Sequence, residues 1–409
     1  MTDELQDALR RTFADAAERA PKAPPGIGLE SGTRRAPRRY ARMALAAAAV
    51  VLAIGGTTVG GRALLSGSQG SGSQSTGGRE PAAAPSPTLH RPKKTKVPPM
   101  EQVWPKAIHR VPRTLTDGRV FRPEAIIDDH TILISTGSSF EKADALYAYD
   151  LNTHGTKQVT QIVTPPQTTV FASGFTVGSG YAAWWVAGDY GGEIWSAPIA
   201  GGAARLVSRV PTSAPSQVAI DGGNVVWSPE RTGGIYRAPV TGGPAKEVPG
   251  TRSMFILAWP WVGSPPPNHA VGESSMGVTA FAHVKNVLTG ETRSARLTDR
   301  AAWKCGLTWC IGHGPNFVTE AQRRDGSGRH AIPEQQPEWG LAPILDRFVI
   351  TFPASGTVGV YDLRTGRSGD LRLTHSKGDS SYVLPRDAAS RLYWATTKGG
   401  YVIVALGAI

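Results

Sequence analysis

The chain has 409 residues, with 48 glycines, 32 prolines, 11 tryptophans and a formal net charge of +12. All 11 tryptophans and both cysteines lie at or after Trp104, so the packed core must form C-terminal to about residue 100. Two basic runs stand out: five arginines within residues 34–42, beside an apolar segment, and four basic residues within 91–96, in a linker. This placement argues against nucleic-acid binding, which needs a basic recognition face on a folded element.

The N-terminal residues 2–20 are predicted to form one short amphipathic helix. Leu5, Leu9 and Phe13 recur at helical spacing and would lie on one face. Such a face could bind a cytoplasmic regulator, for example a sigma factor, or the membrane surface. Alternatively, a single helix of this length is only marginally ordered.

An apolar segment follows at residues 43–65, in which Arg62 is the one charged residue. A membrane span needs about 17–25 mostly apolar residues, so this segment is long enough. Five arginines precede it within residues 34–42, which by the positive-inside rule puts residues 1–42 in the cytoplasm and the rest outside. A cleaved secretory signal and a buried alanine-rich helix are the alternatives. The sequence favours an uncleaved signal anchor and a single-pass cell-membrane protein.

Residues 66–100 are built mainly from Gly, Ser, Gln, Ala and Pro, without hydrophobic periodicity. This composition buries too little apolar surface to offset chain entropy, so a disordered linker is expected. The linker would tether the folded domain, residues 101–409, to the membrane.

Internal repeats predict the architecture of residues 101–409. An apolar alternating strand, entered through a turn residue, recurs at residues 180–184, 223–227, 306–309, 346–350 and 390–394. A second strand with a tight turn after it recurs at residues 146–153, 194–202, 235–243, 281–290 and 358–366. With a weaker copy at residues 317–332, the spacing of about 40–48 residues predicts an all-β propeller of seven four-stranded blades, with six or eight as alternatives.

A short outer strand is expected after each turn, at residues 157–160, 204–207, 245–248, 295–298 and 371–374. The last repeat ends after a strand at residues 402–406 and lacks such an outer strand. Residues 108–116, and residues 113–116 in particular, resemble the missing strand. Donated to the last blade, they would close the ring and remove an open edge.

The Asp/Gly turns and the Ala-Pro-x-x-Gly-Gly turns resemble the blades of the TolB-like and WD40-like propeller superfamily, over most of residues 103–409. This resemblance implies a rigid scaffold with binding loops on its rim. It implies no particular ligand.

Cys305 and Cys310 are the only cysteines. A hairpin that contains both could bring them close enough for a disulfide, which an oxidising compartment would favour. Two free thiols or a redox pair are the alternatives.

The sequence contains no Gly-x-Ser-x-Gly elbow, His-Glu-x-x-His motif, phosphate-binding glycine loop or calcium-binding acidic loop. We therefore expect no catalytic residues, cofactor or metal, although histidines meeting in the channel could make a metal-dependent lactonase or lyase. Trp259 and Trp261, beside a proline run, could form an exposed binding platform or be strand residues of the fourth blade. The expected function is a non-catalytic, extracytoplasmic module that binds a protein or cell-envelope ligand on the propeller rim, with a transmembrane signal transducer as the alternative.

Overall fold

The computed structural model describes residues 96–409, except 138–142, 164–171, 189–190, 212–213, 265–278, 298–301, 314–317, 334, 338–341, 354–357, 373–381, 384–387 and 398. The predicted helix with Leu5, Leu9 and Phe13 and the predicted anchor at residues 43–65 lie outside the described residues. In the described part of the chain, no helix is both long and apolar enough to cross a membrane.

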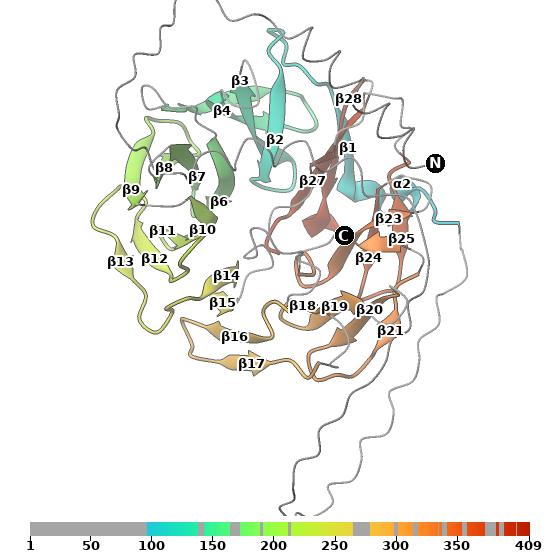
Figure 1. Ribbon diagram of the computed structural model, residues 1–409. Helices are drawn as coiled ribbons and strands as arrows, with labels where there is room; N and C mark the ends of the chain where they lie inside the picture. Colours follow the sequence, from blue (N-terminus) through green and yellow to red (C-terminus); the bar gives the residue numbers. More distant parts are fainter. Residues whose placement is uncertain are drawn as a thin grey trace, which may run out of the picture. The chain divides into compact units, whose positions relative to one another are not determined.

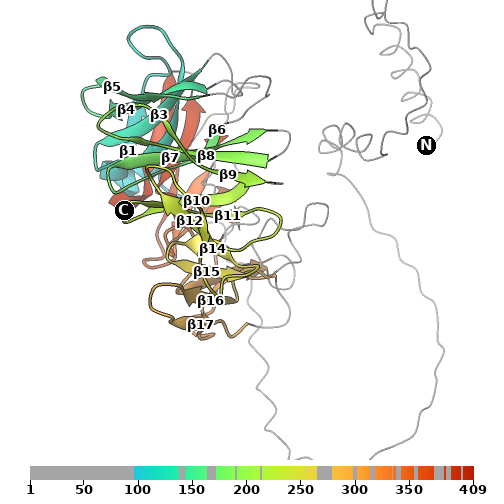
Figure 2. The same cartoon turned by 90° about the vertical axis from the view of Figure 1, so that its left-hand side faces the viewer.

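The described strands form seven four-stranded antiparallel sheets around a central axis, which confirms a seven-bladed β-propeller (Figures 1 and 2). Six blades follow the chain from the inner strand to the outer strand, and the seventh combines strands from both ends of the domain. Blades 1–3 are β2 (Phe121–Ile126), β3 (Thr131–Gly137), β4 (Ala143–Asp150), β5 (Thr156–Gln161); β6 (Ala172–Gly178), β7 (Tyr181–Gly188), β8 (Gly191–Pro198), β9 (Arg205–Pro211); β10 (Pro215–Asp221), β11 (Asn224–Pro229), β12 (Tyr236–Pro239), β13 (Lys246–Glu247). Blades 4–6 are β14 (Phe255–Ala258), β15 (Trp261–Ser264), β16 (His283–Asn286), β17 (Thr292–Ser294); β18 (Lys304–Cys305), β19 (Trp309–His313), β20 (Thr319–Arg323), β21 (His330–Ala331); β22 (Gln335–Pro337), β23 (Phe348–Pro353), β24 (Gly359–Asp362), β25 (Ser368–Asp370). Blade 7 is β26 (Tyr382–Val383), β27 (Leu392–Thr397), β28 (Gly400–Ala405) and β1 (Ile108–Val111).

The hydrophobic core lies between neighbouring blades, because each sheet buries both of its faces. Strand β11 shows this directly: Val225 and Trp227 pack with blade 2, whereas the intervening Val226 packs with blade 4. Successive side chains of a strand point to opposite faces. The continuous apolar runs that repeat along the sequence are therefore required by burial on two sides.

Asx turns connect the third and fourth strands of several blades. The side-chain oxygen of Asp150 accepts hydrogen bonds from the backbone N–H groups of Asn152 and Thr153 at 2.9 and 2.7 Å. Asn286 makes the same pair of contacts, and Asp362 accepts from Arg364 N–H at 2.9 Å. These bonds explain why Asp or Asn, followed three residues later by Thr, recurs in this turn of blades 1, 4 and 6.

Two predicted outer strands were wrong in position. The strands are β17 (Thr292–Ser294), where residues 295–298 were predicted, and β25 (Ser368–Asp370), where residues 371–374 were predicted. In both blades the outer strand begins directly after the Asx turn and therefore earlier than predicted.

The ring closes as predicted, by a strand from the start of the domain. Strand β1 pairs antiparallel with β28, from Ile108↔Val404 to Val111↔Tyr401. The strand, Ile108–Val111, lies within the predicted segment 108–116, although residues 113–116, which carry the resemblance to the other outer strands, are not part of it. Proline supplies no N–H for a ladder, and the strand ends just before Pro112.

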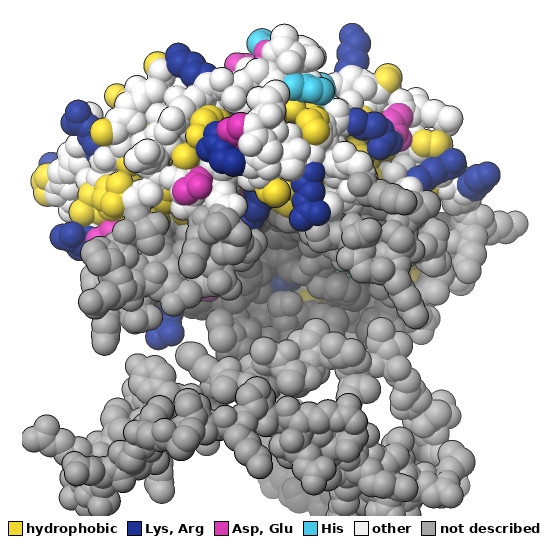
Figure 3. Space-filling view, turned by 90° about the horizontal axis from the view of Figure 1, so that it is seen from above, with side chains coloured by type: hydrophobic (Ala, Val, Ile, Leu, Met, Phe, Trp, Pro, Cys, Tyr) yellow, Lys and Arg dark blue, Asp and Glu magenta, His cyan; other side chains and the backbone are white. Residues whose placement is uncertain are grey.

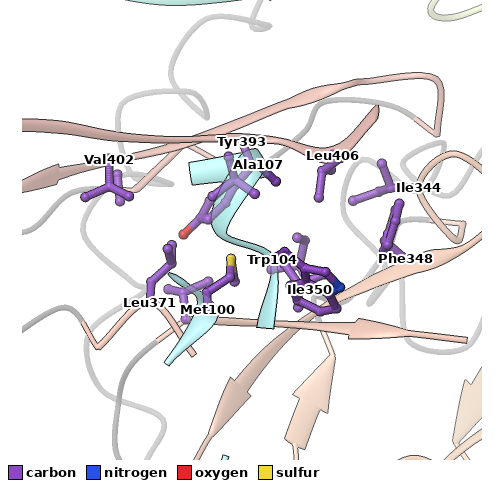
Figure 4. Close-up of a cluster of buried hydrophobic side chains, with 14 residues drawn as sticks. Met100, Trp104, Ala107, Ile344, Phe348, Ile350, Leu371, Tyr393, Val402 and Leu406 are labelled. Atoms are coloured by element: carbon purple, nitrogen blue, oxygen red, sulfur yellow. The ribbon is translucent and has the colours of Figure 1, made fainter. Parts of the chain in front are cut away.

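A short lead-in segment, residues 98–107, precedes β1 and packs against blades 6 and 7. It contains α2 (Met100–Val103) and η1 (Pro105–Ala107). Figure 4 shows Met100 and Trp104 inserted among side chains from these two blades, and both are almost fully buried. Asp370 N–H also donates to the Pro98 carbonyl at 2.9 Å, which ties the segment to β25.

Charged side chains join neighbouring blades at two further places. Arg324, 6 % exposed, donates to the carbonyl oxygens of Gly306 (2.7 Å), Ala282 (2.9 Å) and Phe281 (2.6 Å), and so links blades 4 and 5. Arg347 binds the buried carboxylate of Asp362 at 2.9 and 2.8 Å and also donates to the Ile409 carbonyl at 3.0 Å. The second contact joins the end of the chain to blade 6.

His313, at the end of β19, is expected to make the fold sensitive to acid. Burial lowers the pKa of His313 to about 4, so the unfolded chain takes up a proton at a higher pH than the folded chain does. Stability should therefore fall as the pH drops from about 6.5 towards 4, with no such loss from this group above that range. Urea midpoints measured across this range should show a shallower acid slope for His313→Gln. An unchanged slope would contradict the assignment.

Candidate functional site

The predicted disulfide is present in the structure. Cys305 on β18 and Cys310 on β19 are paired directly across the hairpin, with their Cα atoms 4.0 Å apart. Both side chains are fully buried in the cluster between blades 4 and 5. The bridge is thus part of the scaffold and does not open onto a surface.

The two tryptophans of the predicted platform occupy different environments. Trp261 begins β15, is 8 % exposed, and carries the Arg293 guanidinium 4.5 Å from its ring centroid. Trp259, in the turn before β15, is half-buried and lines the central cavity. The structure therefore does not bring the two rings together on one surface, and the platform stays a prediction.

The inner strands of the first four blades each contain a β-bulge; the one in β14 passes over the core residue Leu257, whereas those of the first three blades face the central channel. The strand register shifts between Pro123 and Ala125 in β2, between Ser173 and Thr176 in β6, and between Pro215 and Gln217 in β10. The residues passed over in these shifts all line the cavity: Glu124, Gly174, Phe175 and Ser216. Bulges re-aim side chains and often lie beside functional sites.

Serine hydroxyls hold two of the bulged residues in place. Ser135 of β3 donates to Glu124 Oε1 at 2.6 Å, and Arg122 Nε lies 4.0 Å from the same oxygen. In blade 3, the hydroxyls of Ser216 and Ser228 are 2.7 Å apart. In blades 1 and 3 the second strand thus fixes the polar group that the inner strand presents to the channel.

Blade 2 uses the bulge differently, to admit an aromatic ring. Gly174 has φ +62°, and a Cβ atom there would overlap Nε1 and Cδ1 of Trp185 from the neighbouring strand β7. Without a side chain at this position, the Trp185 indole reaches past the inner strand and lines the cavity beside Phe175. The glycine is required both for its backbone conformation and for this close approach.

The resulting cavity occupies the half of the channel formed by blades 1–3 and extends to Trp259 and to the turn before β27. Its volume is about 450 Å³, within the usual range for small-ligand sites. Gln217 lines it while only 8 % exposed, so its side-chain amide can meet a ligand there. The buried Trp259 Nε1, on another lining residue, has no hydrogen-bond partner among the described residues, and a buried polar group normally has one, which indicates a ligand or ordered water near this ring.

The rest of the described surface offers no comparable site. Figure 3 shows charged and apolar side chains intermixed over the visible described face, without one dominant patch. The large exposed apolar residues of the described surface are Val120, Val163 and Leu288, which lie on separate segments. Among the described residues, no three or more His, Cys, Asp or Glu side chains are grouped so that they could hold a metal ion.

Replacing Gly174 with alanine should move Trp185 out of its position. We expect a loss of roughly 1–3 kcal/mol in unfolding free energy from backbone strain and displacement of the indole, with a shift in tryptophan fluorescence. Gly180→Ala is the matched control, because Gly180 also has positive φ (+78°) but no atom lies within 4 Å of where its Cβ would stand. A fluorescence change of equal size in both variants would contradict this account of the close approach.

Sequence reasoning missed the bulged residues and their neighbours Trp185 and Gln217. A weak signal was present, because proline precedes Glu124 and Ser216 and a glycine interrupts β6, and both residue types mark irregular strands. The repeat pattern identifies strands, however, and cannot show which of them carries one extra residue.

No family model matches the chain, and no curated protein sequence matches it. Among solved structures, one described as YCF48 bound to D1 peptide is similar over 76% of this chain and 99% of that chain, at 10% identity and a TM-score of 0.47. An oligogalacturonate lyase in complex with manganese is similar over 73% of this chain and 89% of that chain, at 10% identity and a TM-score of 0.43. The C-terminal WD40 domain of Sif2 is similar over 70% of this chain and 97% of that chain, at 11% identity and a TM-score of 0.39. The resemblance concerns the propeller fold alone.

Proposed function

We propose that this chain is a non-catalytic binding module, whose propeller holds a ligand in the channel half formed by blades 1–3. The observation that carries the proposal is the set of three bulges on consecutive inner strands, which together direct a carboxylate, an aromatic pair and a hydroxyl group into one cavity. Bulges re-aim side chains, so those of blades 1–3 can bring these different groups to one cavity, which favours a binding role.

The location that we propose for this module is the outer face of the cell membrane. The support is the apolar segment at residues 43–65, with the arginines of residues 34–42 on its N-terminal side. A buried disulfide suits the same oxidising environment. A signal anchor and linker would then hold the propeller close to ligands of the cell envelope.

Protease treatment of intact cells tests the location. With an epitope tag placed after Ile409, external protease should remove the tag while a cytosolic control protein survives. Loss of the tag only after lysis would refute the proposed topology.

Binding in the channel is tested with the full-length protein in detergent and separated envelope fractions: wall polymer, lipid and secreted protein. At least one fraction should raise the thermal unfolding midpoint, since a ligand that binds only the folded state stabilises it. The shift should shrink in Trp185→Phe and persist in Gln158→Leu, whose side chain lies exposed on outer strand β5. Equal shifts in all three proteins would place binding elsewhere.

A further inference from the structure

We infer that the ligand of the blade 1–3 cavity is an uncharged sugar ring at the end of a glycan, an inference that rests on the proposed channel function. The cavity offers a particular combination of surfaces, and each class of ligand needs a different one. Six lining residues decide between these classes: Glu124, Phe175, Trp185, Ser216, Gln217 and Trp259.

The lining of the cavity combines aromatic and polar surface. Phe175, Trp185 and Trp259 are each partly exposed and line the same cavity. The face of an aromatic ring carries partial negative charge and attracts the C–H groups of an apolar face. A pyranose ring combines such C–H faces with an equatorial belt of hydroxyl groups, so it matches this lining in both respects.

Two side chains that line the cavity have hydrogen-bonding groups available to a ligand. The Gln217 amide offers two donors and an acceptor, and the Trp185 indole offers a donor; neither is engaged by any described residue. Sugar hydroxyl groups donate and accept at once, so they can satisfy an amide that needs both. A purely apolar ligand would displace water from the Gln217 amide and leave it without a partner, at a cost of about 1–3 kcal/mol.

The charge of the Glu124 carboxylate bears on the charge of the ligand. Glu124, whose side chain is 7 % exposed, accepts the Ser135 hydroxyl and lies near the Arg122 guanidinium. Because this carboxylate is already compensated, the cavity does not require a cationic ligand. Its position also disfavours an anionic ligand, whereas a neutral polyol can donate to it without an electrostatic penalty.

The inner strands of the cavity favour a sugar over a peptide as the ligand. An extended peptide commonly binds a sheet by adding a strand to a regular, unpaired edge. The inner strands β2, β6 and β10 are terminal in their sheets, but each is bulged where it faces the cavity. A bulge breaks the even spacing of backbone groups that strand addition needs. Recognition through side chains therefore fits this cavity better than recognition through the backbone.

The test is isothermal titration of the full-length protein in detergent with three neutral oligosaccharides: N,N′,N″-triacetylchitotriose, cellotriose and maltotriose. We expect saturable binding of at least one of them. Gln217→Leu, which removes the amide but keeps most of the volume, should weaken that binding at least tenfold. The control Gln158→Leu should leave the affinity unchanged.

Trp185→Phe is the second variant, and it keeps an aromatic face while removing the indole N–H. A several-fold loss of affinity is expected, so the proposal stays testable if Gln217→Leu fails to fold. Absence of binding for all three sugars, or binding that is insensitive to both variants, would overturn the inference. If a panel of synthetic peptides binds instead, and Gln217→Leu abolishes that binding, the glycan class is wrong although the channel function stands.

Discussion

Gly400→Ala is expected to lower the free energy of unfolding by roughly 3 kcal/mol or more, because it combines backbone strain with a main-chain collision. Gly400 opens strand β28 with φ +153°, a conformation that favours glycine. An added Cβ would overlap the carbonyl oxygen of Val111 and lie 3.0 Å from Pro112 Cα. Neither is a flexible side chain, so relief would require β1 to move away from β28, which is the contact that closes the ring.

The adjacent Gly399 provides the control for this experiment. No atom lies within 4 Å of a Cβ built at Gly399, and its φ is outside the range that only glycine favours. Gly399→Ala should therefore change stability by no more than about 0.5 kcal/mol. Urea unfolding followed by circular dichroism compares the two variants. Similar midpoints would show that closure tolerates displacement of β1.

Arg324→Leu is expected to have the second large effect, again roughly 3 kcal/mol or more. The leucine would leave the carbonyl oxygens of Phe281, Ala282 and Gly306 buried without their donor, and each such loss costs about 1–3 kcal/mol. Burial lowers the pKa of Arg324 to about 10, so the guanidinium is still charged at neutral pH. Arg324→Lys should recover little, because one ammonium group cannot reach carbonyls spread over two blades.

Arg323→Leu is the matched control for Arg324. Arg323 is exposed, and its guanidinium lies 4.8 Å from the Trp309 ring centroid, a contact worth about 0.5–1 kcal/mol. The two neighbouring arginines thus share a charge and a place in the chain while differing in burial. Thermal or urea unfolding of both variants measures the difference, and equal losses would mean that Arg324 is not a link between blades 4 and 5.

The sequence predicted the architecture well because burial on both faces of every blade imposes a pattern that repeats. Each repeat needs an apolar run such as Val225, Val226 and Trp227. The Asx turns add a second periodic signal. The disulfide was also predictable, since two cysteines in one short hairpin have few other arrangements.

The cavity was not predictable by the same reasoning. Its features are departures from the repeat: extra residues in β2, β6 and β10, and an indole admitted by the absence of a side chain at Gly174. The repeat pattern shows only what the blades have in common, so it does not reveal these individual features. Trp185 is sequence-adjacent to the fully buried Trp184, and only the register of the strands shows that it reaches the channel.

The closing pair β1–β28 also has a consequence for synthesis of the protein. Ile108 and Val404 are partners, so β1 leaves the ribosome long before the strand with which it pairs. Until β28 has been synthesised, β1 has no edge to join and the nascent propeller is an open arc with unpaired backbone at both ends. Contacts this distant in sequence form slowly, which leaves a period in which two incomplete chains could exchange their closing strands. The lead-in segment limits that exchange, because Met100 and Trp104 pack against blade 6 and can hold β1 beside its own ring before β28 arrives.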